Sequence, residues 1–326
     1  AAAVPRVAVV TDSTAALPPA LAAQVGLHVV PLDVSVDGAR HVEGVDVTPE
    51  QLLQALERGA KVTTSQPPPS AFAAAYERAA AAGAHEIVSV HLSGEMSGTV
   101  RSARTAATVS PVPVRVVDSR SAALGLGFAA LAAARCAATP LDASKLAGPD
   151  VTAAPADGRA AAVRRWVARV TRREPDAAPT WPDAERVARV AAQAARGTQV
   201  WFLVDSLDHL RRGGRLGAGA AALGTVLGLR PLLSLQDGRL VVAEKIRTRR
   251  AARERLEQVA AAELAARPAA RVGVHHVGPS DVADALAARL AATPGARVVE
   301  TVVADAGAVL AAHVGPGLLA VVVADA

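Results

Sequence analysis

Residues 87–99 read Ile-Val-Ser-Val-His-Leu-Ser-Gly-Glu-Met-Ser-Gly-Thr and join an apolar strand to a polar turn that contains two glycines. The run Ile87–Val90 is rich in β-branched residues, which favours a buried strand. The glycines allow the backbone to turn tightly, while three hydroxyl groups and free N–H groups surround the start of the next helix. A helix start of this kind suits an anion, so Ser93–Thr99 predicts an anion site at the end of a strand.

The same order of strand, polar turn and helix recurs through the first 137 residues. Thr11–Thr14 (Thr-Asp-Ser-Thr) follows one strand, and Asp118-Ser119 follows another. Short strands that alternate with Ala-rich helices predict a parallel sheet with helices on both faces, and ligands of such sheets bind outside the carboxyl ends of the strands. The strands expected in this sheet are Val7–Val10, Val29–Leu32, Ile87–Val90 and Val114–Val117.

Proline and glycine divide the remainder of the chain. Both residue types recur through residues 138–182, which predicts an insertion or linker there. This segment separates an N-terminal domain, residues 1–137, from a C-terminal domain, residues 183–326. The C-terminal domain is expected to contain a mixed sheet with helices, including a hairpin that turns at Asp237-Gly238. The predicted fold class is therefore α/β with two domains.

Composition excludes several classes of function. The 326 residues carry a net charge of +5, but the 35 cationic side chains are dispersed along Ala-rich helices and aromatic residues make up only 2%, so we expect no nucleic-acid partner. No apolar run approaches the roughly 20 residues of a membrane helix, which predicts no stable membrane insertion. The first residues lack a secretory pattern and favour the cytoplasm. The single cysteine, Cys136, excludes an internal disulfide and a multi-thiolate metal site.

Two further patterns bear on cofactors and metals. Gly125–Ala130 fits a relaxed dinucleotide fingerprint, but it lies well beyond the end of the preceding strand, so we assign its glycines to helix packing. His275 and His276 leave a strand toward opposite faces, which disfavours a shared metal ion. We therefore expect neither a cofactor nor a metal.

A second hydroxyl-bearing segment points to the same ligand site. Thr63–Pro67 runs from extended chain into a helix that starts with proline, so Thr64 can aim its hydroxyl at the anion site. A carboxylate held by hydroxyl and amide groups keeps its charge without a buried cation. On sequence alone, a role of these hydroxyls as helix caps explains them equally well.

A serine hydrolase is an alternative reading of the same residues. His91 precedes Ser93 by two positions, and Asp118 is placed to orient it, which makes Ser93 a candidate nucleophile. The nucleophile elbow of such enzymes reads G-x-S-x-G, however, whereas the serine of Gly94–Gly98 comes one place late. A regulatory protein that binds a small anion, such as a phosphorylated metabolite, is a third reading.

Taken in order, the polar clusters resemble those of the DegV family across nearly the whole chain outside about 138–182. Each motif alone is weak evidence for the family, but seven motifs in the family's order are specific evidence for it. The motifs are Thr11–Thr14, Thr64–Pro67, Ser93–Thr99, Asp118-Ser119, Leu207 with Leu210–Arg215, Lys245–Thr248 and His313–Gly317.

This resemblance implies an α/β protein that buries a long-chain fatty acid between two domains. It further implies that hydroxyls of the first motifs, here Thr64 and Ser93, bind the carboxylate, and that the protein presents this carboxylate to a fatty-acid kinase for phosphorylation. A carrier of this kind supplies no catalysis itself. The family commonly has a second serine where this chain has Gly94, so a backbone amide or Ser93 must take over that contact.

Other residues of the motifs extend the expected ligand site. Ser13, Ser97 and Thr99 lie in the hydroxyl-rich turns, whereas His276, Arg247 and His313 lie in loops of the second domain and can approach the carboxylate. Apolar residues near the motifs are candidates for the tunnel wall, although ordinary core packing explains them as well: Met96, Phe72, Leu124 and Leu227. The loop arginines are candidates for contact with an acidic partner: Arg211, Arg212 and Arg215.

Overall fold

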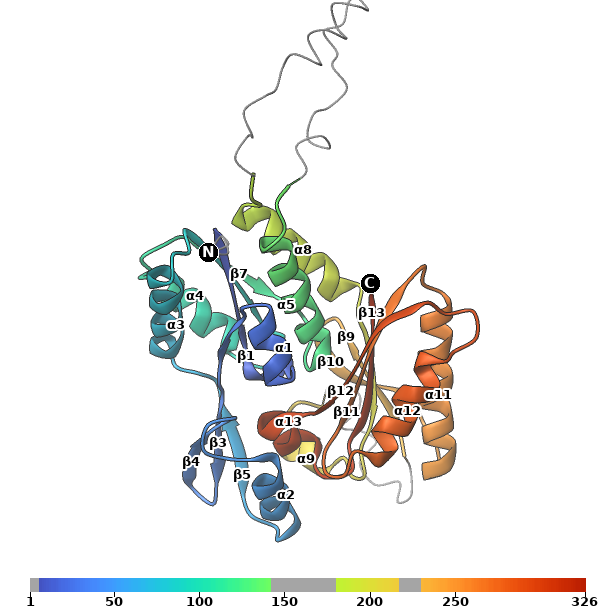
Figure 1. Ribbon diagram of the computed structural model, residues 1–326. Helices are drawn as coiled ribbons and strands as arrows, with labels where there is room; N and C mark the ends of the chain where they lie inside the picture. The colour runs from blue at the N-terminus through green and yellow to red at the C-terminus, as the bar shows by residue number, and fades with distance from the viewer. Residues whose placement is uncertain (1–5, 142–179, 217–229) are drawn as a thin grey trace, which may run out of the picture.

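The computed structural model describes residues 6–141, 180–216 and 230–326. Its first sheet has four parallel strands in the order β2-β1-β6-β7. Val9 and Val10 of β1 face opposite sides of this sheet, and each joins a separate apolar core. The predicted parallel sheet with helices on both faces is confirmed (Figure 1). The strands are β1 (Val7–Asp12), β2 (His28–Val30), β6 (Glu86–His91) and β7 (Val114–Asp118), and the helices are α1 (Pro19–Gln24), α3 (Pro69–Ala81), α4 (Thr99–Ala107), α5 (Leu124–Ala137) and α8 (Ala184–Arg196).

A small antiparallel sheet interrupts this arrangement between β2 and α3. Its strand order is β4-β3-β5, and helix α2 (Pro49–Glu57), which begins at a capping box formed by Thr48 and Gln51, belongs to the same segment. The strands are β3 (Asp33–Val36), β4 (Ala39–Val42) and β5 (Val62–Ser65). This sheet was not foreseen, although residues 32–37 alternate between apolar and polar and Asp37-Gly38 is a hairpin signal. It carries Thr64 on β5.

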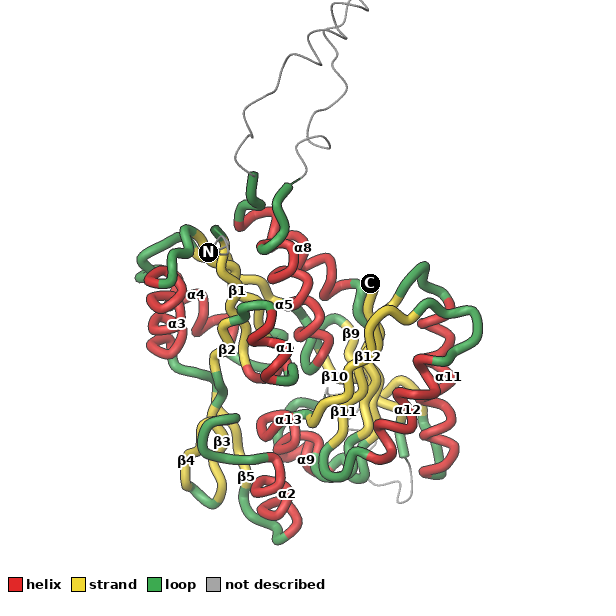
Figure 2. The backbone as a smooth tube through the Cα atoms, in the orientation of Figure 1, coloured by secondary structure: helices red, strands yellow, loops and turns green. Residues whose placement is uncertain are grey.

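The second large sheet is mixed, as predicted. Its strand order is β10-β9-β8-β13-β11-β12; β11 and β12 are parallel, and every other pair is antiparallel. Helices α11 and α12 cover one face, while α5 of the first sheet packs against the other through Leu124 and Phe128 (Figures 1 and 2). The hairpin turns at Asp237-Gly238, both with positive φ. The strands are β8 (Gln199–Leu203), β9 (Leu232–Gln236), β10 (Arg239–Glu244), β11 (Ala270–His276), β12 (Val298–Asp305) and β13 (Leu319–Asp325), and the helices are α9 (Asp208–Arg212), α11 (Arg249–Ala265), α12 (Asp281–Ala291) and α13 (Gly307–Val314).

Helix α8 lies just after the domain boundary predicted at residue 183. It packs on α5 and on β6 and β7 of the parallel sheet, and the carboxylate of Glu86 accepts the N–H of Ala184. We therefore propose that the second unit begins after α8.

Most of the predicted insertion, residues 142–179, lies outside the described residues. The N–H of Leu141 donates to the carbonyl of Thr180 at 2.7 Å, so the two flanks of that segment meet. Among the described residues, no helix is long and apolar enough to span a bilayer.

Candidate functional site

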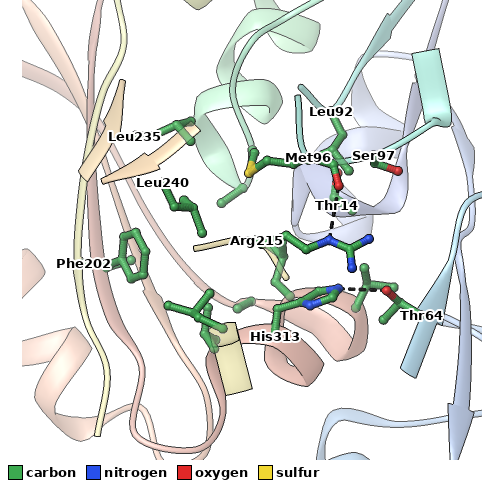
Figure 3. Close-up of a pocket in the computed structure, with 18 of the residues that line it drawn as sticks. Thr14, Thr64, Leu92, Met96, Ser97, Phe202, Arg215, Leu235, Leu240 and His313 are labelled. Atoms are coloured by element: carbon green, nitrogen blue, oxygen red, sulfur yellow. Dashed lines mark hydrogen bonds between the residues drawn. The ribbon is translucent and has the colours of Figure 1, made fainter. Parts of the chain in front are cut away.

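A cavity of about 370 Å³ lies where the loops of the parallel sheet, the small sheet, α13 and the mixed sheet converge. Its wall is largely apolar, and polar side chains gather at one side. Figure 3 shows Thr64, Ser97 and Arg215 on that side, opposite Phe202, Leu235 and Leu240. A mostly apolar cavity with a few convergent polar groups is the usual form of a small-molecule site.

Thr64 and His313 form the central polar pair of the cavity. Oγ1 of Thr64 lies 2.8 Å from Nε2 of His313. Burial, together with the nearby charge of Arg215, lowers the pKa of His313 to about 4, so the ring is neutral near pH 7. Its Nδ1 atom is buried and has no hydrogen-bond partner among the described residues. Both residues were expected in the ligand site, and the structure brings them together.

Arg215 brings a positive charge to the same side of the cavity. Its Nε donates to the carbonyl of Met96 at 3.3 Å, and a second guanidinium nitrogen donates to the carbonyl of Gly213. Within residues 6–141, 180–216 and 230–326, no carboxylate pairs with it. The sequence offered Arg215 only as a candidate for contact with an acidic partner, and not as a residue of the ligand site. The glycine pair before it, of which Gly214 has a φ of +67°, was the available signal that the chain turns here.

Ser97 is the serine of the glycine-containing turn that lines the cavity. Its Oγ lies 2.8 Å from Oγ1 of Thr99, and it accepts the N–H of Thr99 at the start of α4. Thr99 is fully buried beneath it and is not part of the cavity wall. The expected hydroxyl cluster is thus present, with Ser97 as its member toward the cavity.

Ser93 points elsewhere, toward the β9–β10 hairpin. Its Oγ donates to the carbonyl of Gly238 at 2.7 Å, and the residue is fully buried outside the cavity wall. The amide of Gly94 donates to the carboxylate of Asp118, so this expected carboxylate donor is already engaged. Two further contacts tie the hairpin tip to the same region: Arg120 donates to the carbonyl of Asp237, and Arg239 pairs with Glu95.

Three other expected ligand residues do not reach the cavity. Oγ of Ser13 accepts the N–H of Leu32, Nδ1 of His276 lies 2.7 Å from the carbonyl of Gly278, and Arg247 is exposed. Among the tunnel candidates, Met96 lines the cavity, Phe72 and Leu124 belong to the cores, and Leu227 lies outside the described residues.

His275 lines the cavity, whereas the adjacent His276 does not. Nε2 of His275 accepts the N–H of Leu124 at 2.9 Å, and its Nδ1 lies 3.1 Å from the carbonyl of Ala304. Burial lowers its pKa to about 4. The ring of His275, on β11 of the mixed sheet, therefore caps the first residue of α5, which belongs to the other sheet. The sequence shows two adjacent histidines, but only the register of β11 decides which of them faces inward.

His91 does not form a catalytic pair with Ser93. Its Nδ1 lies 2.9 Å from Asp12 Oδ2 and its Nε2 lies 2.6 Å from Oγ of Ser89, both in the buried interior. Asp118, expected to orient His91, instead accepts backbone N–H groups. The geometry of a serine nucleophile with an adjacent base is therefore not present at Ser93.

Comparison with known proteins connects this site to one family. Residues 6–145 and 182–326 match the family described as "Uncharacterised protein, DegV family", leaving residues 146–181 unmatched. A DegV domain-containing protein of Streptomyces coelicolor is 42% identical over 321 residues, covering 98% of this chain and 99% of that protein. A DegV domain-containing protein of Mycobacterium tuberculosis is 38% identical over 97% of this chain and 96% of its own length.

Solved structures show the same fold. A fatty-acid-binding DegV family protein from Thermus thermophilus is 33% identical, with a TM-score of 0.78 over 98% of this chain and 100% of that one. DegV from Bacillus subtilis, described as a fatty acid binding protein, is 26% identical, with a TM-score of 0.76 over 98% of this chain and 99% of that one.

Proposed function

Because this chain belongs to the DegV family, we propose that it binds one long-chain fatty acid, with the acyl chain in the apolar part of the cavity and the carboxylate at Thr64, Ser97, Arg215 and His313. The observation that carries the proposal is the division of this cavity into an apolar and a polar side (Figure 3). Each buried methylene contributes about 0.8 kcal/mol, so a long acyl chain binds tightly with few polar contacts.

The neutral ring of His313 suits a carboxylate that needs hydrogen-bond donors. An ionised carboxylate only accepts hydrogen bonds, so the Thr64 hydroxyl must donate its proton to the ligand. Nε2 of His313 then donates to Oγ1 of Thr64, which requires the proton of the neutral ring on Nε2 and leaves the unpartnered Nδ1 as a bare acceptor. Arg215 adds a charge opposite to that of the ligand, and charge-assisted hydrogen bonds are roughly twice as strong as neutral ones.

The polar side of the cavity also suits presentation of the carboxylate to a partner. Ser65 and Gln66 follow Thr64 in the chain, line the cavity and are exposed, so a carboxylate bound at Thr64 lies close to solvent. We propose that a fatty-acid kinase phosphorylates it there, and that this chain supplies no catalytic group. A partner that uses ATP places this step in the cytoplasm.

Native mass spectrometry of protein purified from bacteria tests the binding proposal. We expect a co-purifying mass in the range of long-chain acids, lost after delipidation and regained with palmitate. A phosphorylated metabolite in its place contradicts the proposal and favours a small-anion regulator. A burst of product from a chromogenic acyl ester contradicts it in favour of a hydrolase.

Kinase presentation has its own test. The palmitate-loaded protein, a fatty-acid kinase of the same organism and ATP are mixed, and acyl phosphate is trapped with hydroxylamine. We expect hydroxamate only when all components are present. Its absence, with palmitate still bound, contradicts presentation and leaves the binding proposal intact.

A further inference from the structure

Helix α13 is capped at its start by a local carboxylate and by a distant one. The first backbone N–H groups of an α-helix lack partners, and a Ser, Thr, Asp or Asn just before the helix usually accepts one of them. Ala306 occupies that position and has no capping side chain. Oδ1 of Asp305 accepts the N–H of Gly307 at 2.7 Å. The N–H of Val309, two residues further on, donates to Oε1 of Glu43 at 2.8 Å, across 266 positions of the chain. A carboxylate from a distant segment therefore caps this helix.

The carboxylate of Glu43 is closely enclosed. The residue is 9% exposed, and a Cβ atom added at Gly307, which has a φ of +82°, would lie 2.6 Å from Oε1. Glycine at position 307 makes this close approach feasible. Burial raises the pKa of Glu43, while the Ser13 hydroxyl and the N–H of Val309 oppose that rise. No donor among the described residues lies within normal hydrogen-bond distance of its Oε2. A buried carboxylate with one unpartnered oxygen costs stability, which an apolar side chain would avoid.

Glu43 joins the two elements that carry the central polar pair of the cavity. It directly follows β4, in the small sheet that holds Thr64 on β5. Val309, whose N–H it accepts, lies one helical turn before His313 on α13. The small sheet packs on α13 through β3 and β5, and two hydrogen bonds join these parts, one at the Glu43 cap and one between Thr64 and His313.

We propose that Glu43 is a positioning residue for the ligand site, which sets the position of α13 and thereby keeps His313 within hydrogen-bond distance of Thr64. Its effect on ligand affinity rests on the proposed function, whereas its effect on His313 does not. A buried carboxylate costs stability that an apolar side chain would not. This cost supports a role of Glu43 in orienting α13, and not in packing alone.

Two substitutions of Glu43 and a matched control test this role. Glu43→Gln keeps an acceptor for Val309, whereas Glu43→Leu removes it. Asp33→Leu is the control, because Asp33 is also 9% exposed in the small sheet but pairs with Arg40 of that sheet. The readouts are the side-chain nitrogen signals of His313 by NMR and the affinity for carbon-13 carboxyl-labelled palmitate. We expect Glu43→Leu to shift the His313 signals and weaken palmitate binding about tenfold, and Glu43→Gln to stay within about twofold.

A pair of glycine substitutions repeats the test should Glu43→Leu fail to fold. Gly307→Ala displaces the carboxylate, whereas Gly295→Ala imposes similar strain, at a φ of +76°, with nothing within 4 Å of the added Cβ. We expect only Gly307→Ala to shift His313. Unchanged His313 signals in Glu43→Leu and Gly307→Ala overturn the inference, as does an equal shift in Asp33→Leu. A wild-type protein that binds no palmitate overturns the proposed function alone.

Discussion

Oγ1 of Thr64 lies 2.8 Å from Nε2 of His313, although 249 positions separate them in the chain. Thr64 belongs to the small sheet and His313 to the helix before the last strand. Their contact closes the polar side of the cavity and brings a neutral ring, a hydroxyl and the charge of Arg215 together. Five predictions follow from this arrangement and its surroundings.

Thr64→Val should weaken palmitate binding about tenfold, because a buried carboxylate loses one of its donors. Thr63→Val is the matched control, since neighbouring residues of a strand point to opposite faces and Thr63 is exposed. Titration calorimetry on delipidated protein measures both affinities. Equal affinities in the two variants would remove Thr64 from the ligand site.

Arg215→Gln should weaken binding of palmitate about tenfold, through the loss of a charge-assisted contact, but leave binding of the alcohol of the same chain length unchanged. The exposed Arg212 of the same loop provides the control, Arg212→Gln. Competition against a fluorescent fatty acid measures the two ligands. An equal loss for acid and alcohol indicates a structural effect and contradicts the charge contact.

Leu240→Trp should exclude the acyl chain, because Leu240 lines the apolar side of the cavity and a larger side chain fills that space. Val299→Trp places the same ring on the outer strand β12, where Val299 is 47% exposed. Native mass spectrometry should show a retained acid in the control only. Full retention in a folded Leu240→Trp protein contradicts the placement of the acyl chain.

Ser93→Ala and Ser97→Ala should have opposite consequences. Ser93 bonds to Gly238, so its loss should lower the free energy of unfolding by about 1 kcal/mol and leave palmitate affinity nearly unchanged. Ser97 lines the cavity, so its loss should lower the affinity. Denaturant titrations and calorimetry separate the two quantities. Affinity lost only with Ser93→Ala would return the carboxylate contact to Ser93.

The pKa of His313 should be near 4 by NMR titration, and Arg215→Gln should raise it without reaching 6.5, because burial is the larger cause of the shift. The folded protein binds fewer protons than the unfolded chain between these values, so stability is full above about pH 6.5 and falls as the pH drops toward 4. His313→Gln should flatten this dependence. The same pH dependence in wild type and variant contradicts the assignment.

Local pattern was sufficient for much of the fold. β-branched runs and Ala-rich helices predicted the parallel sheet, and Asp237-Gly238 predicted the hairpin, because strand and turn preferences act over a few residues. The predicted segment before a proline-started helix also placed Thr64 on an extended strand. The family resemblance rested on such local motifs and is confirmed.

The choice among neighbouring side chains depended on the tertiary structure. Ser97 and His275 line the cavity, whereas Ser93 and His276 do not, because the path of one turn and the register of one strand decide which side chain points inward. Residue types alone therefore identified the hydroxyl-rich turn and the histidine pair, but not their directions. Arg215 reaches the ligand side, and Glu43 caps α13, through contacts between distant segments, and such contacts leave no periodic pattern in the sequence.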